Sequence, residues 1–301
     1  PKRRRHDVVL MDIHMPDMDG IQATREIMQT CPVPVVIASS TLRKRDVDMG
    51  LEAYRAGAVS VIEKPEGAVL LNLSKIGPQL KSELQAAAQA RLSRVAPRAP
   101  ENRASTTGWP VRQLEGIEVV GLCASTGGPP VLLQILETLP RPYPVPILLV
   151  QHISHAFVEG FAHWLGSTTR QRVNLAVAGA RLEPGIWVSP GELHIGLTAD
   201  RRIDLQPRRS GEIHCPSGDA LFESLAKAMG SAALGVLLTG MGADGAQGLL
   251  ALKQAGGHTI VQDEASSLIW GMPKAGKELG AADAEHNPSA IARVLAEIAR
   301  P

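Results

Sequence analysis

Three polar residues that could together hydrolyse an ester or an amide follow apolar, strand-like stretches in the part of the chain after residue 115. Ser125 ends GIEVVGLCAS, His152 ends VPILLVQH, and Asp244 lies in the loop TGMGADG after ALGVLLTG. A hydroxyl nucleophile, an imidazole base and a carboxylate are the components of a serine hydrolase triad. In this interpretation His152 takes the proton of Ser125, and Asp244 fixes the imidazole tautomer.

Glycines next to the serine and the aspartate favour this interpretation. In CASTGGP, two consecutive glycines allow the backbone to approach a substrate closely. The amide groups that open the following helix would favour a developing oxyanion. The loop TGMGADG offers a second set of backbone donors for the same purpose.

Each of these residues also has an ordinary structural interpretation. Ser125 could cap the helix that follows it, Asp244 could cap its own following helix, and His152 could be a hydrogen-bonded residue at a strand end. A metal site built on His152, His155 and His163 lacks a carboxylate at a known spacing. Known motifs do not decide the question. Cys123 interrupts the pattern G-x-S-x-G, no GxGxxG follows the strand that ends at Ser125, and the chain has no GK[ST].

Composition excludes several other classes of protein. The 301 residues are 44% hydrophobic and 20% charged, with a formal net charge of +1 and only 3% aromatic residues. Charge balance and scarce aromatic residues argue against nucleic-acid binding. The three cysteines form no CxxC pair, and no apolar run approaches the roughly 20 residues of a membrane span. We expect a cytoplasmic protein without membrane insertion.

Alternating strand and helix patterns predict an α/β fold in two parts. Short β-branched runs at 7–12, 33–40 and 60–65 alternate with helical patterns, and a second, longer series of strands and helices begins at residue 116. Between them lie a helical stretch, which Gly77-Pro78 should break or kink, and a linker rich in Pro, Ser and Thr. The predicted domains are 1–66, 67–115 and 116–301, the last a doubly wound, mostly parallel sheet with some antiparallel additions. Its active groups should gather at the carboxyl ends of the strands.

Five motifs of the second part resemble the catalytic domain of the CheB-type chemotaxis protein-glutamate methylesterases. They are, in order, GLCASTGGP, VQH, PGELH, LLTGMGADGAQGL and QDEASSLIWGMP, and the resemblance covers about 116–298. It implies a serine esterase that removes methyl groups from glutamates of chemoreceptors, deamidates certain glutamines and needs no cofactor for catalysis. It also implies that Ser125, His152 and Asp244 form the triad, with backbone donors near Thr126 and Met241 as the oxyanion hole.

Residues 7–65 resemble a response-regulator receiver. Asp12 in DVVLMDIHMPDMDG matches the phosphoacceptor, Ser39 the switch hydroxyl and Lys64 the lysine that contacts the acyl-phosphate. A flavodoxin-like sheet has five strands, whereas only three are counted here. We therefore expect a partial receiver with an exposed first strand. Either the chain is a fragment of a longer protein or its phosphorylation switch is defective. Mg²⁺, a phosphodonor kinase and phosphorylation of Asp12 are therefore expected of the intact parent protein.

The leading hypothesis is thus a receptor methylesterase whose receiver occludes the cleft until Asp12 is phosphorylated by a chemotaxis histidine kinase. A binding module that uses the same cleft to dock a peptide, and a general small-molecule esterase, are the alternatives. Two further expectations concern the cleft. His194 should be a loop residue near its rim, and Trp270 and Met272 should pack at a turn.

Overall fold

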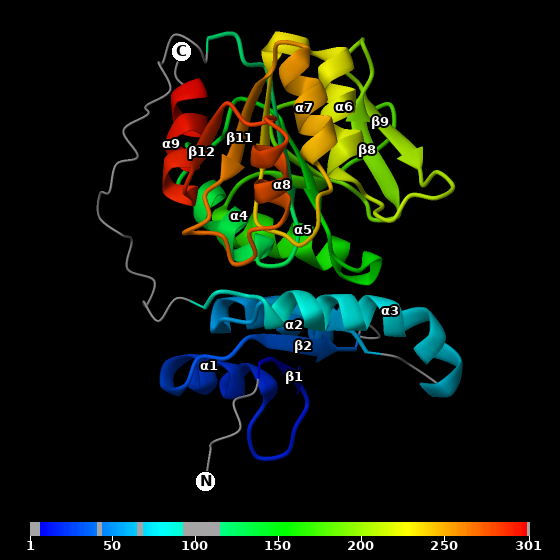
Figure 1. Ribbon diagram of the computed structural model, residues 1–301, viewed down its shortest axis with the longest axis vertical. Coiled ribbons are helices and arrows are strands. Elements are labelled where there is room, and N and C mark those ends of the chain that lie inside the picture. Colours follow the sequence, from blue (N-terminus) through cyan, green and yellow to red (C-terminus); the bar gives the residue numbers. More distant parts are fainter. Residues whose placement is uncertain (1–6, 41–43, 65–68, 93–114, 300–301) are drawn as a thin grey trace. The chain divides into compact units, whose positions relative to one another are not determined.

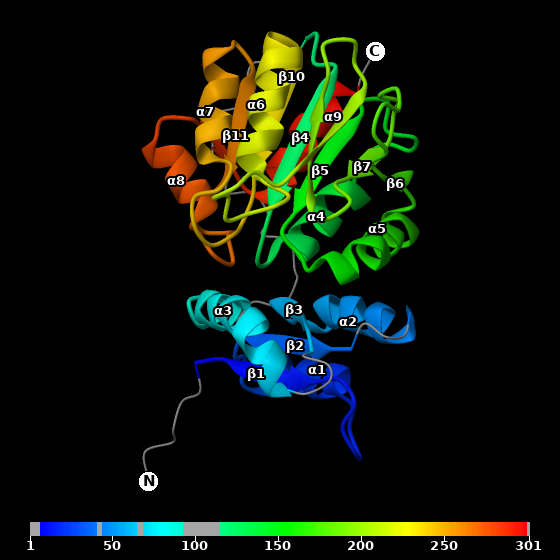
Figure 2. The same cartoon turned by 90° about the vertical axis from the view of Figure 1, so that its right-hand side faces the viewer.

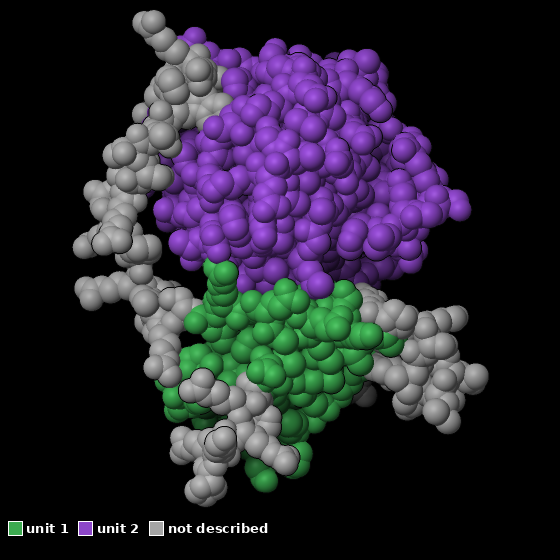
Figure 3. Space-filling view, in the orientation of Figure 1, with its two compact units in different colours: residues 1–98 green, residues 99–301 purple. Residues whose placement is uncertain are grey.

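The computed structural model describes residues 7–40, 44–64, 69–92 and 115–299. The chain divides into two compact units, residues 1–98 and 99–301, which are coloured separately in Figure 3. None of the helices in the described segments combines the length and the hydropathy that crossing a bilayer requires.

The first unit contains a parallel sheet with the strand order β1-β2-β3. Helices connect successive strands, as the alternating pattern predicts. In chain order the elements are β1 (Val9–Asp12), α1 (Gly20–Thr30), β2 (Val35–Ser39), α2 (Lys44–Ala56), β3 (Ser60–Glu63) and α3 (Val69–Ala88). β1 lies at one side of the sheet, and its Leu10 is 47% exposed, as expected for a strand with one neighbour.

The helix does not break at Gly77-Pro78, because α3 runs through both residues; the alternative, a kink there, stays a prediction. A proline removes one backbone hydrogen bond from a helix. The helix here is 20 residues long and rich in Leu, Ala and Gln, all good helix formers. Its length and composition outweigh that local loss.

The second unit confirms the predicted doubly wound α/β architecture. Its seven-stranded sheet has the order β12-β11-β10-β4-β5-β7-β6, and every pair in it is parallel. The strands of this sheet are β4 (Val119–Ala124), β5 (Ile147–Gln151), β6 (Val173–Leu175), β7 (Ile186–Val188), β10 (Ala233–Leu237), β11 (His258–Gln262) and β12 (Ala284–His286).

Helices cover both faces of this sheet (Figures 1 and 2). One face carries α4 (Gly128–Glu137), α5 (His155–Thr169) and α9 (Pro288–Ile298). The other carries α6 (Gly218–Ala228), α7 (Ala246–Gln254) and α8 (Met272–Glu278), with a short 3₁₀ turn at Gly230–Ala232 before β10. An antiparallel hairpin of β8 (Leu193–Leu197) and β9 (Ile203–Pro207) packs beside α6 and is the expected antiparallel addition.

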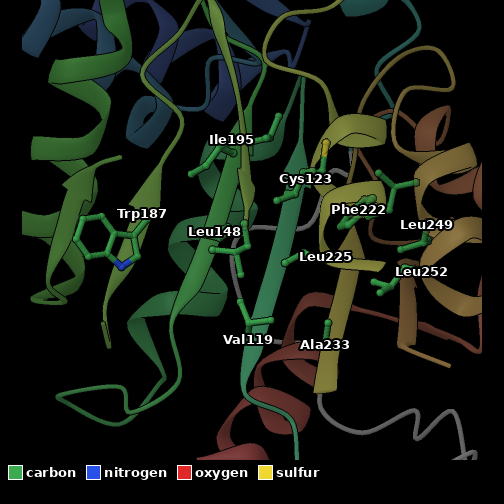
Figure 4. Packing of buried hydrophobic residues seen from close by; sticks show 14 of the residues in the cluster. Val119, Cys123, Leu148, Trp187, Ile195, Phe222, Leu225, Ala233, Leu249 and Leu252 are labelled. Carbon is green, nitrogen blue, oxygen red and sulfur yellow. The ribbon is translucent and has the colours of Figure 1, made fainter. Parts of the chain in front are cut away.

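Phe222 and Leu225 of α6 and Leu249 and Leu252 of α7 fill the core against the sheet (Figure 4), where two glycines lie beneath them. Gly121 of β4 and Gly235 of β10 are register partners. A Cβ on Gly121 would lie 2.6 Å from Leu225 Cδ1, and one on Gly235 would lie 2.7 Å from Leu249 Cδ1. A side chain at either position would push leucine side chains of α6 or α7 away from the sheet. This close packing fixes where the first residues of α6 meet the strand ends.

β4 is the strand from which the chain builds the sheet in both directions. From β4 the chain adds β5, β7 and β6 on one side and β10, β11 and β12 on the other. In open α/β sheets, ligands bind beyond the carboxyl ends of the strands at such a switch point. The ends of β4, β5 and β10 are therefore the place where chemistry is expected.

Candidate active site

Ser125 directly follows β4 and is held by backbone contacts on both sides. Its N–H donates to the carbonyl of Thr239, which lies beyond β10, at 3.0 Å, and its own carbonyl accepts the N–H of Gly128 at 2.8 Å. The residue is only 7% exposed. A strand end that is bonded to the neighbouring strand's extension holds the hydroxyl in one place.

His152 comes next to Ser125 through the register of the sheet. β4 and β5 pair Ala124 with Gln151, and the N–H of His152 continues the ladder by donating to the Ala124 carbonyl at 2.9 Å. Because the strands are parallel, the following residues Ser125 and His152 lie side by side and on the same face of the sheet. The sheet itself therefore makes Ser125 and His152 neighbours across β4 and β5.

Gln151 is a buried positioning group that sequence reasoning missed. Its side-chain Nε2 donates to the carbonyl of Ser125 and to the carbonyl of His152, each at 3.0 Å, and the residue is 4% exposed. One amide thus ties together the two backbone segments that carry the hydroxyl and the imidazole. The motif VQH contained this residue, but its amide could have been assigned only with the strand pairing known.

The imidazole and the carboxylate are in direct contact. His152 Nε2 lies 2.9 Å from Asp244 Oδ2, and the two side chains are 12% and 7% exposed. The ring N–H is not aligned with the oxygen as in a good hydrogen bond, so this contact is a close, largely electrostatic pairing. Nδ1 of His152 is buried and has no hydrogen-bond partner among the described residues.

The N-terminus of α6 keeps Asp244 ionised. The Ser217 hydroxyl donates to Oδ1 and the Gly218 N–H to Oδ2, each at 2.6 Å, while the Asp219 N–H donates to Oδ1 at 3.4 Å. Burial alone would raise the pKa of Asp244. The contact with His152 and these donors outweigh burial and hold that pKa well below its ordinary value. The site therefore contains a fixed negative charge against the ring at all but strongly acid pH.

The capping interpretations of Ser125 and Asp244 are wrong. Gly127, in a left-handed conformation at φ 79°, is the N-cap of α4, and no side chain caps that helix. Gly245 likewise precedes α7, again without a side-chain cap. Asp244 does bind backbone N–H groups of a helix, but they belong to α6, which precedes it in the chain.

Cys123 lies two residues before Ser125 and close to the same groups. Its Sγ and the ligand atoms of His152 and Asp244 lie within 4.8 Å of one another, the one such metal-capable group in the described part of the chain. The expected alternative with His155 and His163 is not assembled there. Burial first, then the charges of Asp244 and Asp219, raise the pKa of the Cys123 thiol well above its ordinary value. A metal ligand or a nucleophile must be the thiolate, so Cys123 fits neither role and packs as a small apolar residue.

A second histidine covers the ring of His152. His214 stacks on it with ring centroids 4.7 Å apart and an interplanar angle of 6°. Desolvation, followed by the charge of His152, lowers the pKa of His214, which favours a neutral ring beside the base. Sequence reasoning missed His214, because its segment EIHCPSGD shows no periodicity and only its neighbours Ser217 and Gly218 fix its place.

The expectation that His194 is a loop residue is wrong. His194 lies on β8, is 4% exposed, and contacts Glu212 at 2.8 Å through Nε2. PGELH reads as a turn in the sequence, but only PGE forms one, and the histidine already belongs to the strand that α6 covers. Its contact with Glu212 instead anchors the segment that carries His214.

The two segments proposed to supply oxyanion donors lie beside Ser125. Thr126 follows it directly and is 6% exposed. Met241 follows Gly240, at which a Cβ would lie 2.6 Å from the Cβ of Ser125. The backbone of Gly240 forms a bridge with Trp270, and Met272 is fully buried at the start of α8, as expected of packing at a turn. The oxyanion roles of Thr126 and Met241 stay predictions.

In the first unit, the three predicted receiver residues end the three parallel strands or follow them. Lys64 Nζ contacts Asp12 Oδ2 at 2.6 Å, and the Lys64 N–H donates to the carbonyl of buried Ser39 at 2.8 Å. Partial burial would raise the pKa of Asp12, but the hydrogen bond from Lys64, that from the His14 N–H and the nearby positive charge lower it. Among the described residues, no group of three ligands gathers at Asp12, so these residues alone do not make a complete Mg²⁺ site.

Comparisons with known proteins agree with this geometry. Residues 120–295 match the family described as CheB methylesterase, and residues 2–73 match the response regulator receiver domain. The protein-glutamate methylesterase/protein-glutamine glutaminase 3 of Myxococcus xanthus is 40% identical over 280 residues, which is 93% of this chain and 77% of that protein. A relative from Geobacter metallireducens, numbered 4 under the same name, is 40% identical over 99% of this chain and 86% of its own length.

A solved structure shows the same fold in the second unit. The crystal structure of the Thermotoga maritima CheB methylesterase catalytic domain matches with a TM-score of 0.58 at 34% identity, covering 60% of this chain and 97% of that one. The sequence matches, this shared fold and the order of the strand-end residues lead to one assignment. The chain belongs to the CheB methylesterase family and carries response regulator receiver sequence ahead of the methylesterase domain.

Proposed function

We propose that this protein is a serine hydrolase that removes methyl groups from glutamate γ-methyl esters of chemoreceptors and deamidates glutamines there. The observation that carries the proposal is the His152–Asp244 pair, 2.9 Å apart, beside Ser125 on the neighbouring strand end. Membership of the CheB methylesterase family, whose relatives carry both activities in their names, supports the substrate class.

The chemistry runs in two halves. Ser125 Oγ attacks the γ-carbonyl carbon while His152 Nδ1 takes the hydroxyl proton, and the carbonyl oxygen becomes an oxyanion near the backbone of Thr126 and Met241. The tetrahedral intermediate collapses, His152 returns the proton to the leaving group, and methanol or ammonia departs. Water then attacks the glutamyl ester on Ser125 with the same base. This step releases glutamate and restores the hydroxyl.

The carboxylate of Asp244 faces the ring of His152 during both halves. When the ring takes a proton it becomes a cation, and the nearby carboxylate stabilises that cation in a site largely closed to water. The α6 donors hold the carboxylate in place without neutralising it. The carboxylate and its donors therefore need to move little when positive charge develops on the His152 ring.

Methanol release from a methylated receptor tests the proposal. We expect Ser125→Ala to lower kcat by about 10³-fold or more, while the melting temperature and far-UV circular dichroism stay near those of the wild type. Unchanged methanol release by this variant would remove Ser125 from the reaction. Wild-type hydrolysis of a simple nitrophenyl ester with no action on the receptor would instead indicate a general esterase, and binding of the receptor without turnover would indicate a docking module.

We further propose that phosphorylation of Asp12 by a chemotaxis histidine kinase regulates this activity in the intact parent protein, with Mg²⁺ required for that transfer. The strand-end grouping of Asp12 and Lys64, 2.6 Å apart, supports a phosphoacceptor role. The described residues do not complete the cation site, so no step is derived through the metal. Receptors as substrates and three unpaired cysteines are consistent with action in the reducing cytoplasm.

A further inference from the structure

The most exposed large apolar side chain in the described part of the chain lies beside the catalytic groups. Ile213 is 84% exposed, whereas the other exposed large hydrophobic residues range from 36% to 61%. A single exposed aliphatic residue is ordinary on a protein surface. Ile213 differs in its position, because it directly precedes His214, whose ring stacks on His152. Consecutive Cα atoms are about 3.8 Å apart, so Ile213 belongs to the edge of the active site.

Ile213 is exposed even though its segment is firmly held. Glu212 Oε2 accepts the N–H of Arg209 at 2.7 Å and contacts His194 Nε2, on buried β8, at 2.8 Å. On its other side, Ser217 bonds Asp244 at 2.6 Å. The segment between β9 and α6 is thus fixed at both ends. The exposure of Ile213 is therefore a feature of a held backbone and not of a loose loop.

The charge around Ile213 is positive. Arg208 and Arg209 are both exposed. The Arg208 side chain hydrogen-bonds Cys215, and no salt bridge to a carboxylate is found for either arginine in the described ranges. The nearest acidic neighbour in the segment, Glu212, is already engaged by His194. An apolar contact flanked by cations fits a partner surface that combines an aliphatic patch with carboxylates.

We propose that Ile213, with Arg208 and Arg209, is the surface on which the receptor's methylated helix docks. The inference rests on the proposed function, since the occupant is the substrate itself. The occupant proposed is an amphipathic helix whose apolar residues recur at three- and four-residue spacing and which has carboxylates beside its methylated glutamate. Such a helix can place an apolar side chain on Ile213 and acidic side chains against the two arginines, while the modified residue reaches Ser125.

Steady-state kinetics with two substrates test this docking surface. One substrate is a methylated receptor fragment, and the other is the γ-methyl ester of a blocked glutamate, which has no helix to dock. For Ile213→Asp we expect KM for the receptor to rise about tenfold or more with little change in kcat, since burying an isoleucine contributes on that scale. Hydrolysis of the small ester should be unchanged, and Ile213→Leu should behave as the wild type on both substrates.

Val177 supplies the matched control, because it is the next most exposed large apolar residue, at 61%, and lies in the same unit. Val177→Asp should leave both substrates unaffected. A double variant, Arg208→Glu with Arg209→Glu, should raise the receptor KM and weaken its dependence on salt.

Several results would overturn the docking proposal. They are a receptor KM within twofold of the wild type for Ile213→Asp, an equal effect of Val177→Asp, or a parallel loss on the small ester. Failure of the wild type to hydrolyse either substrate would instead contradict the proposed function.

Discussion

Replacing Asp244 by asparagine removes the charge of the site while keeping most of its hydrogen bonds. Oδ1 accepts a hydroxyl proton from Ser217, and Oδ2 accepts the Gly218 N–H and faces His152. The Ser217 hydroxyl can turn to accept a hydrogen bond, but the Gly218 amide can only donate. The new NH₂ group should therefore take the Oδ1 position, and the amide oxygen should stay against Gly218 and His152.

The size of the effect follows from the distance between the charges. Two unit charges 2.9 Å apart attract by about 6 kcal/mol at an effective dielectric constant of about 20. A barrier higher by that amount would slow the reaction by roughly 10⁴-fold. The asparagine oxygen still points a partial negative charge at the ring, so we expect kcat to fall by about 10³- to 10⁴-fold.

Methanol release under single-turnover conditions measures this loss, with thermal unfolding as the check on folding. Asp219→Asn is the matched control, since this neighbouring carboxyl accepts the Gly248 N–H at 2.7 Å and its side chain does not contact His152. We expect the control to keep nearly full activity. A folded Asp244→Asn variant with kcat within tenfold of the wild type would refute an ionised partner for the base.

Three other predictions concern the groups around the two sites. Gln151→Leu leaves the carbonyls of Ser125 and His152 without their shared donor, so thermal scans should show a lower Tm and methanol assays a kcat reduced about tenfold or more; a kcat equal to that of the wild type would exclude the positioning role. His214→Ala should lower kcat by about two- to tenfold through loss of the stack, while His214→Phe, which keeps a planar ring there, should restore it; equal rates for the two variants would contradict stacking. Lys64→Met should raise the pKa of Asp12 in an NMR titration, because the lysine is a main cause of its lowering. A carboxyl whose pKa is lowered in the native state stabilises the fold at pH values above its unfolded pKa of about 3.9, and this stabilisation is lost as the pH falls through the native pKa. The free energy of unfolding should therefore decrease less on acidification in the Lys64→Met variant than in the wild type.

The fold and the position of the site could be predicted because the buried strands of the sheet are visible in the sequence as short apolar runs. β4, β5 and β10 are buried on both faces, so each appears in the sequence as an unbroken apolar run with a polar residue or a glycine-rich loop at its end. In a parallel sheet these ends meet at one edge. That reasoning placed Ser125 and His152 side by side before the strand order was known.

The remaining features depend on tertiary contacts that leave no local pattern. β6 and β12 have three residues each, too few to show a period. His214 reaches His152 only because α6 begins against Asp244, and His194 is buried only because α6 covers β8. Gln151 looked like one more strand residue until the pairing of β4 with β5 brought two carbonyls to its amide.

Labelling with a fluorophosphonate, which reacts with activated serine hydroxyls, tests the central claim most directly. Peptide mapping by mass spectrometry should find the adduct on Ser125, and labelling should fall sharply in a His152→Ala variant that remains folded. An adduct on another residue, no adduct at all, or equal labelling without the imidazole would contradict a hydroxyl at 125 activated by the His152–Asp244 pair.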